Sequence, residues 1–382
     1  MTSRVSEGGV GYSMVRQDIL RTLCLLLVIV MAAPLLSGQV SSAEDSSGDN
    51  TTTYNLYFGD LHSHTSYSDG TGTPWEAYEA AIDAGADFMA LTDHVAIWNS
   101  YDAWIADVEE WNDTLAAADF YTSEEFVAMA GYEAWLLAQC GEINVYNTRE
   151  LPNSQLLNRN NRLQSFYDWL AQQPGAIGQF NHPLYVSDNF EDYSFYTEAR
   201  DTGMNIIEVY NDVFYEDSYI MALDAGWHIM PAANSDTHYP DWIAGHEMRT
   251  VLLAENRIAE YLYDAMSACR GYATLDKNLE IYYTLNGAIM GSDLSDPGVT
   301  DYTASIQIGD PDGLGDEITL VEIISNGGEV IEAIVTSGDY VDITVDLESE
   351  DAQYFYVRVT TASPLNGDPG VTAWTSPVWT GA

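Results

Sequence analysis

Seven short apolar runs recur between Tyr54 and Asp236, separated by longer stretches with helical patterning or turn residues. Alternation of this kind is typical of βα units, whose strands pair in a largely parallel sheet. Seven units favour a closed barrel over an open sheet. The runs are NLYFGDL, DFMALTD, FVAMAGYE, INVYNT, AIGQFNH, NIIEVYN and HIMPAANSD.

The best-marked helix follows the first run. Thr73 offers an N-cap hydroxyl, Pro74 suits the first helical position, and Glu76 can complete a capping box. Gly85 can end the helix. The sequence therefore predicts a capped helix between Thr73 and Gly85.

Histidine is scarce, yet five of the seven histidines fall in short motifs at the ends of apolar runs. Strand ends of a (β/α) barrel converge on one mouth, where active sites are built. Residues i and i+2 of a strand face the same side, and imidazole with carboxylate suits zinc, manganese or iron. The motifs therefore predict a metal centre. They are His62-Ser63-His64, Ser68-Asp69-Gly70, Thr92-Asp93-His94, Asn181-His182-Pro183 and Ser235-Asp236-Thr237-His238.

The texture of the chain changes after Lys277. Segments such as ASIQIGD, VDITVDL and YFYVRVTT alternate apolar and polar residues between turn residues. This pattern predicts a small antiparallel β-sandwich over residues 276–382. It contains no histidine, and its aromatic residues, Trp374 and Trp379 among them, are interpreted as packing rather than as a sugar-binding platform.

The first residues have the pattern of a targeting segment. Arg16 and Arg21 precede an apolar run, and Ser41-Ser42-Ala43 offers a cleavage site. The run is shorter than the roughly 20 residues of a membrane span, so we expect a signal peptide over 1–43 and an exported protein, with uncleaved anchoring as the alternative. A polar linker, 44–53, and a barrel domain, 54–275, follow in this prediction.

The formal net charge is −47, and Lys277 is the single lysine. A surface of this charge repels nucleic acid, so no nucleic-acid partner is expected. The simplest interpretation is a solvated acidic surface of the kind found in halophilic proteins, because salt screens the repulsion among its carboxylates.

Five motifs resemble, in order and spacing, those of the PHP (polymerase and histidinol phosphatase) superfamily. They are DLHSHTSYSDG, LTDH, AGYE, NHP and NSDTH. Later segments, including GYATLDKNL, LNGAIMGS and WTSPVW, are similar to the exported branch that includes carbaryl-hydrolase-like (CehA/McbA-like) metallohydrolases. The resemblance implies a distorted, TIM-like (β/α)7 barrel followed by the β-sandwich.

The resemblance also implies which residues hold metal. It implies two or three divalent ions of zinc, manganese or iron. The ligands implied for the first ion are His62, His64, Glu133 and Asp236. Glu133 would bridge to a second ion that His182 also holds, and the ligands implied for the third are Asp69, His94 and His238.

One position departs from the family pattern. Similar proteins carry a Gly-His pair after the bridging glutamate, whereas this chain has Gly141-Glu142. Either Glu142 coordinates the second ion, and the metal preference of that site moves from zinc towards manganese or magnesium, or the second site is weak or empty. We favour coordination by Glu142.

Other polar residues are candidates around the metals. Asp236 is expected to be catalytic as well as a ligand, and His246 is either a proton donor to the leaving group or loop filler. Asp93 is a candidate for orienting His94. Glu208 and Asn211 are predicted to line the substrate pocket.

Two arginines and one histidine remain to be interpreted. Arg149 and Arg270 either bind an anionic group of the substrate or pair with surface carboxylates. His228 is interpreted as a half-buried structural histidine.

These features together predict an exported metal-dependent hydrolase. Hydroxide made by the ions would cleave a small-molecule phosphoester, or a carbamate or aryl ester. The alternative is a catalytically impaired barrel that acts as a secreted or surface-attached binding module. Neither the substrate nor the oligomeric state follows from the sequence.

Overall fold

The computed structural model describes residues 43–45, 52–96, 106–135, 140–152, 161–183, 189–294, 299–312, 317–349, 351–362 and 370–381. All of them belong to one compact unit, Ala33–Ala382. The predicted targeting segment, 1–43, lies outside the described residues except for Ala43. No helix within these ranges is both long and apolar enough to cross a membrane.

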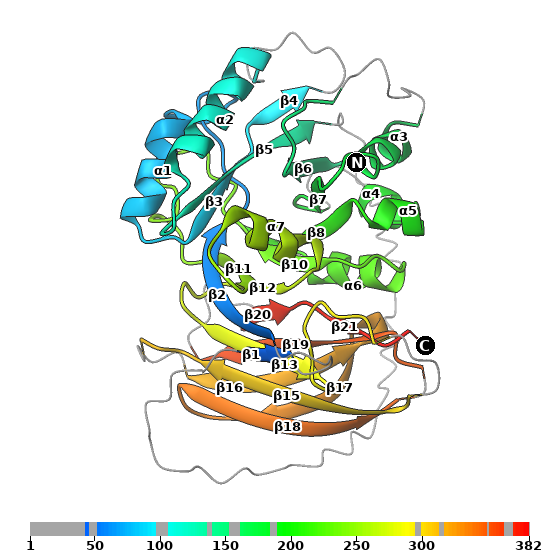
Figure 1. Cartoon of the computed structure of the whole chain (residues 1–382). Coiled ribbons are helices and arrows are strands. Elements are labelled where there is room, and N and C mark those ends of the chain that lie inside the picture. The colour runs from blue at the N-terminus through cyan, green and yellow to red at the C-terminus, as the bar shows by residue number, and fades with distance from the viewer. Residues whose placement is uncertain are drawn as a thin grey trace, which may run out of the picture. The chain divides into compact units, whose positions relative to one another are not determined.

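The architecture is mixed α/β, and strands from all seven apolar runs follow one another by direct pairing (Figure 1). They are β2 (Thr52–Asp60), β3 (Phe88–Leu91), β5 (Val127–Trp135), β6 (Glu142–Tyr146), β7 (Ile177–Phe180), β8 (Met204–Asn211) and β10 (Met230–Ala233). The short strand β4 (His94–Ala96) also pairs with β5. Most of these strands are buried along their whole length, which explains their continuous apolar runs.

The last of these strands returns to the first. Beyond β2 and β10, Ser63 and Thr237 form a parallel bridge. Asp236 N donates to His62 O at 2.9 Å, and His64 N donates to Thr237 O at 2.9 Å. The ends of β2 and β10, which carry two of the histidine motifs, are thereby fastened side by side.

Strand β6 runs against its neighbours. The pairs β2–β3, β3–β5, β7–β8 and β8–β10 are parallel, whereas β6 is antiparallel to both β5 and β7. Its first residue, Glu142, therefore lies at the end of the sheet where β5 and β7 finish. A sheet of uniform βα units would have placed Glu142 at the opposite end.

The helices pack around these strands, with α1 (Pro74–Asp83) on β3 and α2 (Val108–Tyr121) on β5 (Figure 1). The predicted capping box of α1 is confirmed: Glu76 N donates to Thr73 Oγ1 at 3.3 Å, and Thr73 N donates to Glu76 Oε2 at 2.8 Å. Gly85 follows the helix with φ +80°. The other helices are α3 (Arg162–Leu170), α4 (Asn189–Asp192), α5 (Glu198–Asp201), α6 (Glu216–Asp224) and α7 (Ala259–Ser267).

The large sheet continues beyond these seven strands into the C-terminal residues. Strand β11 (Arg249–Ala254) pairs with β2 and with β12 (Gly271–Thr274), and β12 pairs with β20 (Val371–Thr375). Beyond β20 come β19 (Tyr354–Thr361), β16 (Ile318–Ser325) and β17 (Glu329–Val335). Two short strands, β9 (Val213–Phe214) and β21 (Val378–Trp379), pair with β8 and β19, and a 3-10 turn, η1 (Asn326–Gly328), joins β16 to β17.

A second, four-stranded sheet contributes to a separate core. Its strands, in order, are β14 (Ala288–Ile289), β13 (Glu280–Leu285), β15 (Asp301–Gly309) and β18 (Tyr340–Glu348). Their apolar side chains share this core with side chains of the large sheet, including Tyr54, Val251, Leu253 and Tyr272. The boundary predicted at residue 275 is thus crossed by both a continuous sheet and a common core.

The stretch predicted as a linker, 44–53, is also partly paired. Strand β1 (Ala43–Asp45) is antiparallel to Thr52–Tyr54 of β2. This backbone pairing was not evident from the polar composition of the stretch, because the side chains alone do not reveal that β2 extends past its apolar run.

Candidate metal centre

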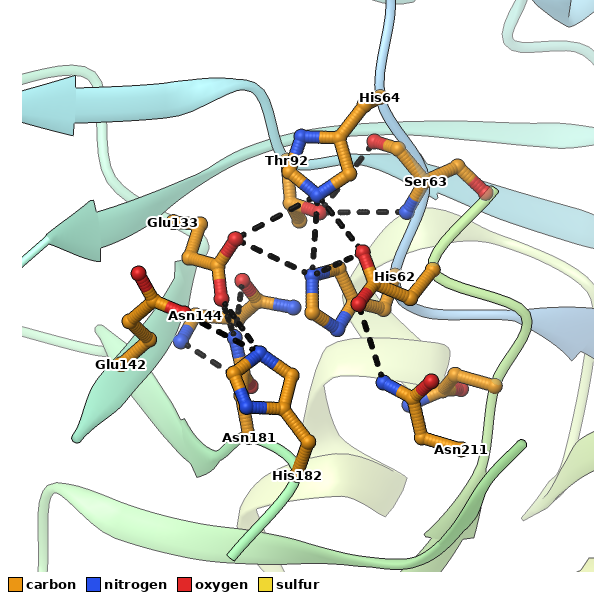
Figure 2. A network of polar contacts seen from close by, with 12 residues as sticks. His62, Ser63, His64, Thr92, Glu133, Glu142, Asn144, Asn181, His182 and Asn211 are labelled. Carbon is orange, nitrogen blue, oxygen red and sulfur yellow. Dashed lines mark hydrogen bonds and ion pairs between the residues drawn. The ribbon is translucent and has the colours of Figure 1, made fainter. Parts of the chain in front are cut away.

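Glu133, at the end of β5, lies at the middle of the clustered histidines (Figure 2). Its Oε2 lies 3.3 Å from His62 Nε2, 3.4 Å from His64 Nε2 and 3.0 Å from His94 Nδ1. Its Oε1 lies 3.2 Å from His182 Nε2 and accepts from Asn181 Nδ2 at 2.7 Å. One buried carboxylate therefore faces four imidazoles, an arrangement in which it can bridge cations.

Asp236 closes the first group of potential ligands. Its Oδ1 lies 3.2 Å from His62 Nε2 and 2.9 Å from His64 Nε2. Potential ligand atoms of His62, His64, Glu133 and Asp236 all lie within 4.8 Å of one another. These are the four residues that the resemblance implies for the first ion.

A second group shares His64 and opens towards solvent. It consists of His64, Asp69, His94 and His238, again with ligand atoms within 4.8 Å. Asp69 Oδ1 lies 3.1 Å from His238 Nε2 and 3.7 Å from His94 Nε2. The structure thus brings together the three residues implied for the third ion and adds His64 to them.

Glu142 lies on the other side of Glu133 (Figure 2). With His94 and Glu133 it forms a third group, and its Oε2 lies 3.3 Å from His182 Nε2. It is there because β6 is antiparallel, so that its first residue lies opposite Trp135 and its main chain accepts from Asn181 N at 3.1 Å. The substitution of glutamate for the expected histidine therefore does not remove the side chain from the cluster.

Hydrogen bonds fix which nitrogen of three imidazoles faces inward. His62 Nδ1 lies 2.9 Å from Glu208 Oε1, and His238 Nδ1 lies 2.8 Å from the carbonyl oxygen of Asp236. His64 Nδ1 lies 3.3 Å from Ser68 Oγ, whose own hydrogen goes to Asp93. All three partners are acceptors, so Nδ1 carries a proton and Nε2 is the nitrogen that faces a carboxylate oxygen.

Charge in the cluster shifts the pKa of most of its members. Burial lowers the pKa of His64, but the Asp236 and Glu133 carboxylates outweigh it and raise this pKa to about 10. Burial raises the pKa of Asp236, but His62 and His64 outweigh it and lower this pKa. Burial, followed by the charge of Glu133, raises the pKa of Glu142 to about 8. The imidazoles and the carboxylates thus stabilise one another's charged forms, whereas the neighbouring charge of Glu133 favours the neutral form of Glu142.

Three buried atoms of the cluster make no hydrogen bond with any described residue: His94 Nδ1, Glu133 Oε2 and Asp236 Oδ1. Buried polar atoms in proteins are normally satisfied, and each exception needs an explanation. Lone pairs of nitrogen and oxygen converge here from several sides, which is the environment of a cation. The donor set, imidazole and carboxylate, fits divalent zinc, manganese or iron.

Asp93 supports a different histidine from the one expected. Its carboxylate accepts from Thr65 N at 2.8 Å, from Thr65 Oγ1 at 2.6 Å and from Ser68 Oγ at 2.6 Å. Through Ser68 it orients His64, whereas the sequence suggested its neighbour His94. The loop after His64 turns back on itself, so proximity in the chain was a poor guide.

Other candidate residues lie apart from the cluster. Arg149 is two-thirds exposed and donates to both oxygens of Asp119. Arg270 lies over the ring of Tyr54, and His228 pairs with Asp201 at 2.8 Å. The structure therefore does not bring Arg149 or Arg270 to the potential ligands.

His246, the candidate proton donor, faces Asp241 rather than the potential ligands. Its Nε2 lies 3.6 Å from Asp241 Oδ1 and is buried without a hydrogen bond to any described residue. Glu208 and Asn211 were predicted to line the pocket. Both contact the cluster from its buried side. Glu208 is fully buried behind His62, and Asn211 donates to both Glu208 and Asp236.

Sequence reasoning missed the amides that surround the cluster. Three of these amides are buried: Asn144, Gln179 and Asn234. Asn144 accepts from Asn181, whereas Gln179 and Asn234 both donate to Glu208. A signal was present, because each of these amides lies inside or directly after an otherwise apolar run. Such residues in buried strands require partners, and the convergence of the strand ends supplies them.

The chain matches the model of the PHP domain over residues 60–257, just over half of its length. No curated protein matches it. Among solved structures it is similar to a two-domain protein from Bacteroides vulgatus ATCC 8482 that contains a predicted PHP-like metal-dependent phosphoesterase. That likeness has 16% identity and a TM-score of 0.45, over 89% of this chain and 100% of that chain. It is also similar to an amidohydrolase from Chromobacterium violaceum with bound sulfate and no metal, at 16% identity and a TM-score of 0.31, over 47% of this chain and 87% of that chain.

Proposed function

This chain belongs to the PHP domain family, and on that premise we propose that it is a metal-dependent hydrolase. The observation that carries the proposal is the set of three overlapping ligand groups, two of which share Glu133, with three buried ligand atoms left without hydrogen bonds. Divalent ions bound there would act as Lewis acids and lower the pKa of water. Two or three ions of zinc, manganese or iron fit the donor set.

The protein's own residues would hold and orient these ions. Glu133, His64 and His94 belong to two groups each, so all three can contribute to more than one position. The Nδ1 partners of His62, His64 and His238 orient these rings with Nε2 inward before metal arrives. Preparation of this kind lowers the reorganisation that binding requires.

We propose Glu142 as a ligand of the second position, together with Glu133 and His182. A carboxylate there in place of an imidazole favours harder ions, manganese above zinc. Glu142→His would test this by competition between Mn²⁺ and Zn²⁺, because the variant should shift the preference towards zinc. An unchanged Mn²⁺/Zn²⁺ ratio would exclude Glu142 from the coordination.

The substrate we propose is a small ester that carries little negative charge. Most of the cations in the described part of the chain are engaged elsewhere by carboxylates, as in the pairs Arg149–Asp119, Arg200–Asp168, Arg257–Asp87, Lys277–Glu247 and Arg358–Glu216. A singly charged phosphodiester, or a neutral carbamate or aryl ester as in the CehA/McbA-like branch, suits such a site better than a phosphate monoester. Asp236 is the proposed catalytic carboxylate.

One purified preparation tests the proposal. Metal content is measured by mass spectrometry, and turnover with aryl phosphate mono- and diesters and an aryl carbamate. His62→Ala and Asp236→Ala should lose metal and at least about 100-fold in kcat/KM, because each removes a ligand of the first metal position. His228→Ala is the matched control, since its pair with Asp201 lies outside the three groups.

Two results would favour the alternative of an impaired barrel that only binds. They are trace metal in every variant and no turnover of any substrate by the unmodified chain. Metal uptake without turnover would support the site and reject the enzyme.

We also propose that the protein is exported and that its acidic surface is adapted to salt. The charge of −47 and the apolar run before the cleavage motif support this. N-terminal sequencing of the secreted protein should begin near Glu44. Unfolding in low and in molar salt should show higher stability in molar salt, because screening weakens the repulsion among carboxylates. Equal stability in both would contradict the adaptation.

A further inference from the structure

Glu208, on β8, is the most enclosed carboxylate behind the candidate metal centre. It is fully buried, and its two oxygens face five donors. Oε1 lies 2.9 Å from His62 Nδ1 and accepts from Asn234 Nδ2 at 2.9 Å and from Gln179 Nε2 at 3.4 Å. Oε2 accepts from His182 N at 2.6 Å and from Asn211 Nδ2 at 3.0 Å.

This set of donors leaves no free acceptor on Glu208. An ionised carboxylate offers about four lone-pair sites, and five donors already point at them. A substrate group could not reach the side chain without displacing one of these partners. Glu208 is therefore badly placed for the pocket-lining role that its position at a strand end suggested.

Four of the five donors come from β2, β7 and β10, whose ends carry potential metal ligands, and the fifth, Asn211, ends β8 itself. His62 follows β2 and His182 follows β7, while Asn211 connects Glu208 to Asp236, which follows β10, by a further bond of 3.3 Å to Asp236 Oδ2. One carboxylate thus reaches three of the potential ligands from behind. It contacts the ring of His62 and the main-chain N–H of His182, and it is linked to Asp236 through the Asn211 amide.

Two of these ligands have strained backbones. His182 has φ +25° and Asp236 has φ +48°, which residues other than glycine rarely adopt. Such conformations persist only where the surroundings impose them. The short bond from His182 N to Glu208 Oε2 is a restraint of that kind, and Asn211 supplies another on the side chain of Asp236.

We infer that Glu208 is a positioning residue that sets the tautomer of His62 and holds His182 in its strained backbone conformation, so that the first and second metal positions depend on one side chain. The inference rests on the proposed function, because it concerns the same metal centre. A carboxylate that accepts the Nδ1 proton of a ligating histidine both fixes the ring and makes its other nitrogen more basic.

Co²⁺ binding, followed by its visible absorption and by titration, tests the inference on the full chain. Glu208→Gln preserves size but removes the charge and turns one acceptor into a donor that faces either His62 or His182. We expect roughly 10- to 100-fold weaker Co²⁺ binding and an altered absorption spectrum. Glu208→Asp, which restores the charge at a shorter reach, should recover part of the affinity.

Asn205→Ala is the matched control. Asn205 is a buried polar residue of the same strand, and its amide donates to Ser267 O rather than to a potential ligand. A purely structural role of Glu208 predicts the same behaviour for both variants, with a lower melting temperature and an unchanged Co²⁺ spectrum. We expect that behaviour from Asn205→Ala alone.

The outcomes separate the inference from the proposed function. If the unmodified chain takes up no Co²⁺, the proposed metal centre fails. If it does, and Glu208→Gln binds Co²⁺ with the same affinity and spectrum, the inference is overturned while the metal centre stands. If Glu208→Gln does not fold, Glu208→Asp decides, because wild-type affinity at both positions in that variant would equally overturn the inference.

Discussion

At the scale of single residues, the centre depends on groups that touch no metal themselves. Ser68 is one: its hydroxyl donates to Asp93 and accepts from His64, so that a serine lies between a buried carboxylate and a potential ligand. Removing it leaves the other bonds of Asp93, both to Thr65, in place. The ring of His64 alone loses its restraint.

Ser68→Ala should therefore weaken metal binding by about 10-fold with little loss of stability, since such outer partners commonly contribute 10- to 100-fold. Titration with Mn²⁺ and thermal unfolding of the metal-free protein measure the two effects. Asp113→Asn is the control, because Asp113 accepts from Tyr67 of the same loop and from Trp75 but from no potential ligand. Equal losses of affinity in both variants would contradict the argument.

A second prediction concerns pH. Burial lowers the pKa of His182, but Glu133 outweighs it and raises this pKa to about 9, and the pKa of His64 is raised to about 10. Both imidazoles are charged at pH 7 in the metal-free protein, and metal must displace their protons. Their ion pairs stabilise the metal-free protein fully below the unfolded-state pKa of about 6.5, and this stability is lost as pH rises through 9 and 10.

The melting temperature of the metal-free protein should thus fall between pH 7 and pH 10, while the increase caused by Mn²⁺ should grow over the same range. Differential scanning calorimetry with and without metal measures both. Proton release on metal addition at pH 7.5, followed in weak buffer, gives an independent reading. A metal-induced increase that does not vary with pH would rule out displacement of protons from these histidines.

Single residues also show what the sequence could and could not predict. The spacing of His62 and His64 predicted that both face one side, and the structure places their Nε2 atoms 3.2 Å apart. The partner of Asp93 was not predictable, because it depends on how the loop 65–70 folds back. Glu208 was predicted to line the pocket because it lies at a strand end, and only the three-dimensional arrangement shows that it faces the back of His62.

At the scale of elements, strand direction decides what reaches the centre. The apolar runs indicated the strands and their order, since each is long enough to be buried and ends in polar residues. They could not indicate that β6 is reversed, because a short run of mostly buried residues has the same pattern in either direction. Glu142 enters the cluster through that reversal.

The loop between β2 and α1 leaves no room for a larger residue at Gly70. Gly70 N donates to Thr65 O at 3.0 Å, and a Cβ on Gly70 would lie 2.9 Å from His64 C and from Thr65 N and O. These are backbone atoms of the segment that carries His64, so the loop would have to move. Asp69, next to Gly70, would move with it.

Gly70→Ala should cost about 1–3 kcal/mol of stability through overpacking and should reduce metal content by one ion, the one near Asp69. Gly85→Ala is the matched control. Its φ is +80°, and nothing lies within 4 Å of the added Cβ, so it should cost about 1–2 kcal/mol through backbone strain and leave the metal content unchanged. Mass spectrometry of both variants decides, and equal metal content in both would contradict a role for the loop in holding that ion.

At the scale of the whole molecule, the two regions differ in sequence texture but share their structure. Alternating strands after Lys277 correctly suggested a second, antiparallel region. Its attachment was not predictable, because β12 and β20 pair across about a hundred intervening residues. The far faces of β2, β11 and β12 belong to the second core, to which Tyr54, Val251, Leu253 and Tyr272 contribute buried side chains.

The chain cut after residue 275 should therefore fail to fold alone, even though the cut follows the predicted boundary. Exposing a buried apolar side chain costs about 1.5–3 kcal/mol, so these four together cost roughly 6–12 kcal/mol. A typical domain has a total stability of about 5–15 kcal/mol, which leaves little or nothing. We expect residues 44–275 to be insoluble when expressed alone and to become soluble, and able to bind Mn²⁺, when residues 276–382 are co-expressed. A soluble 44–275 fragment that unfolds cooperatively at the temperature of the full chain would show that the second core is dispensable for the metal centre.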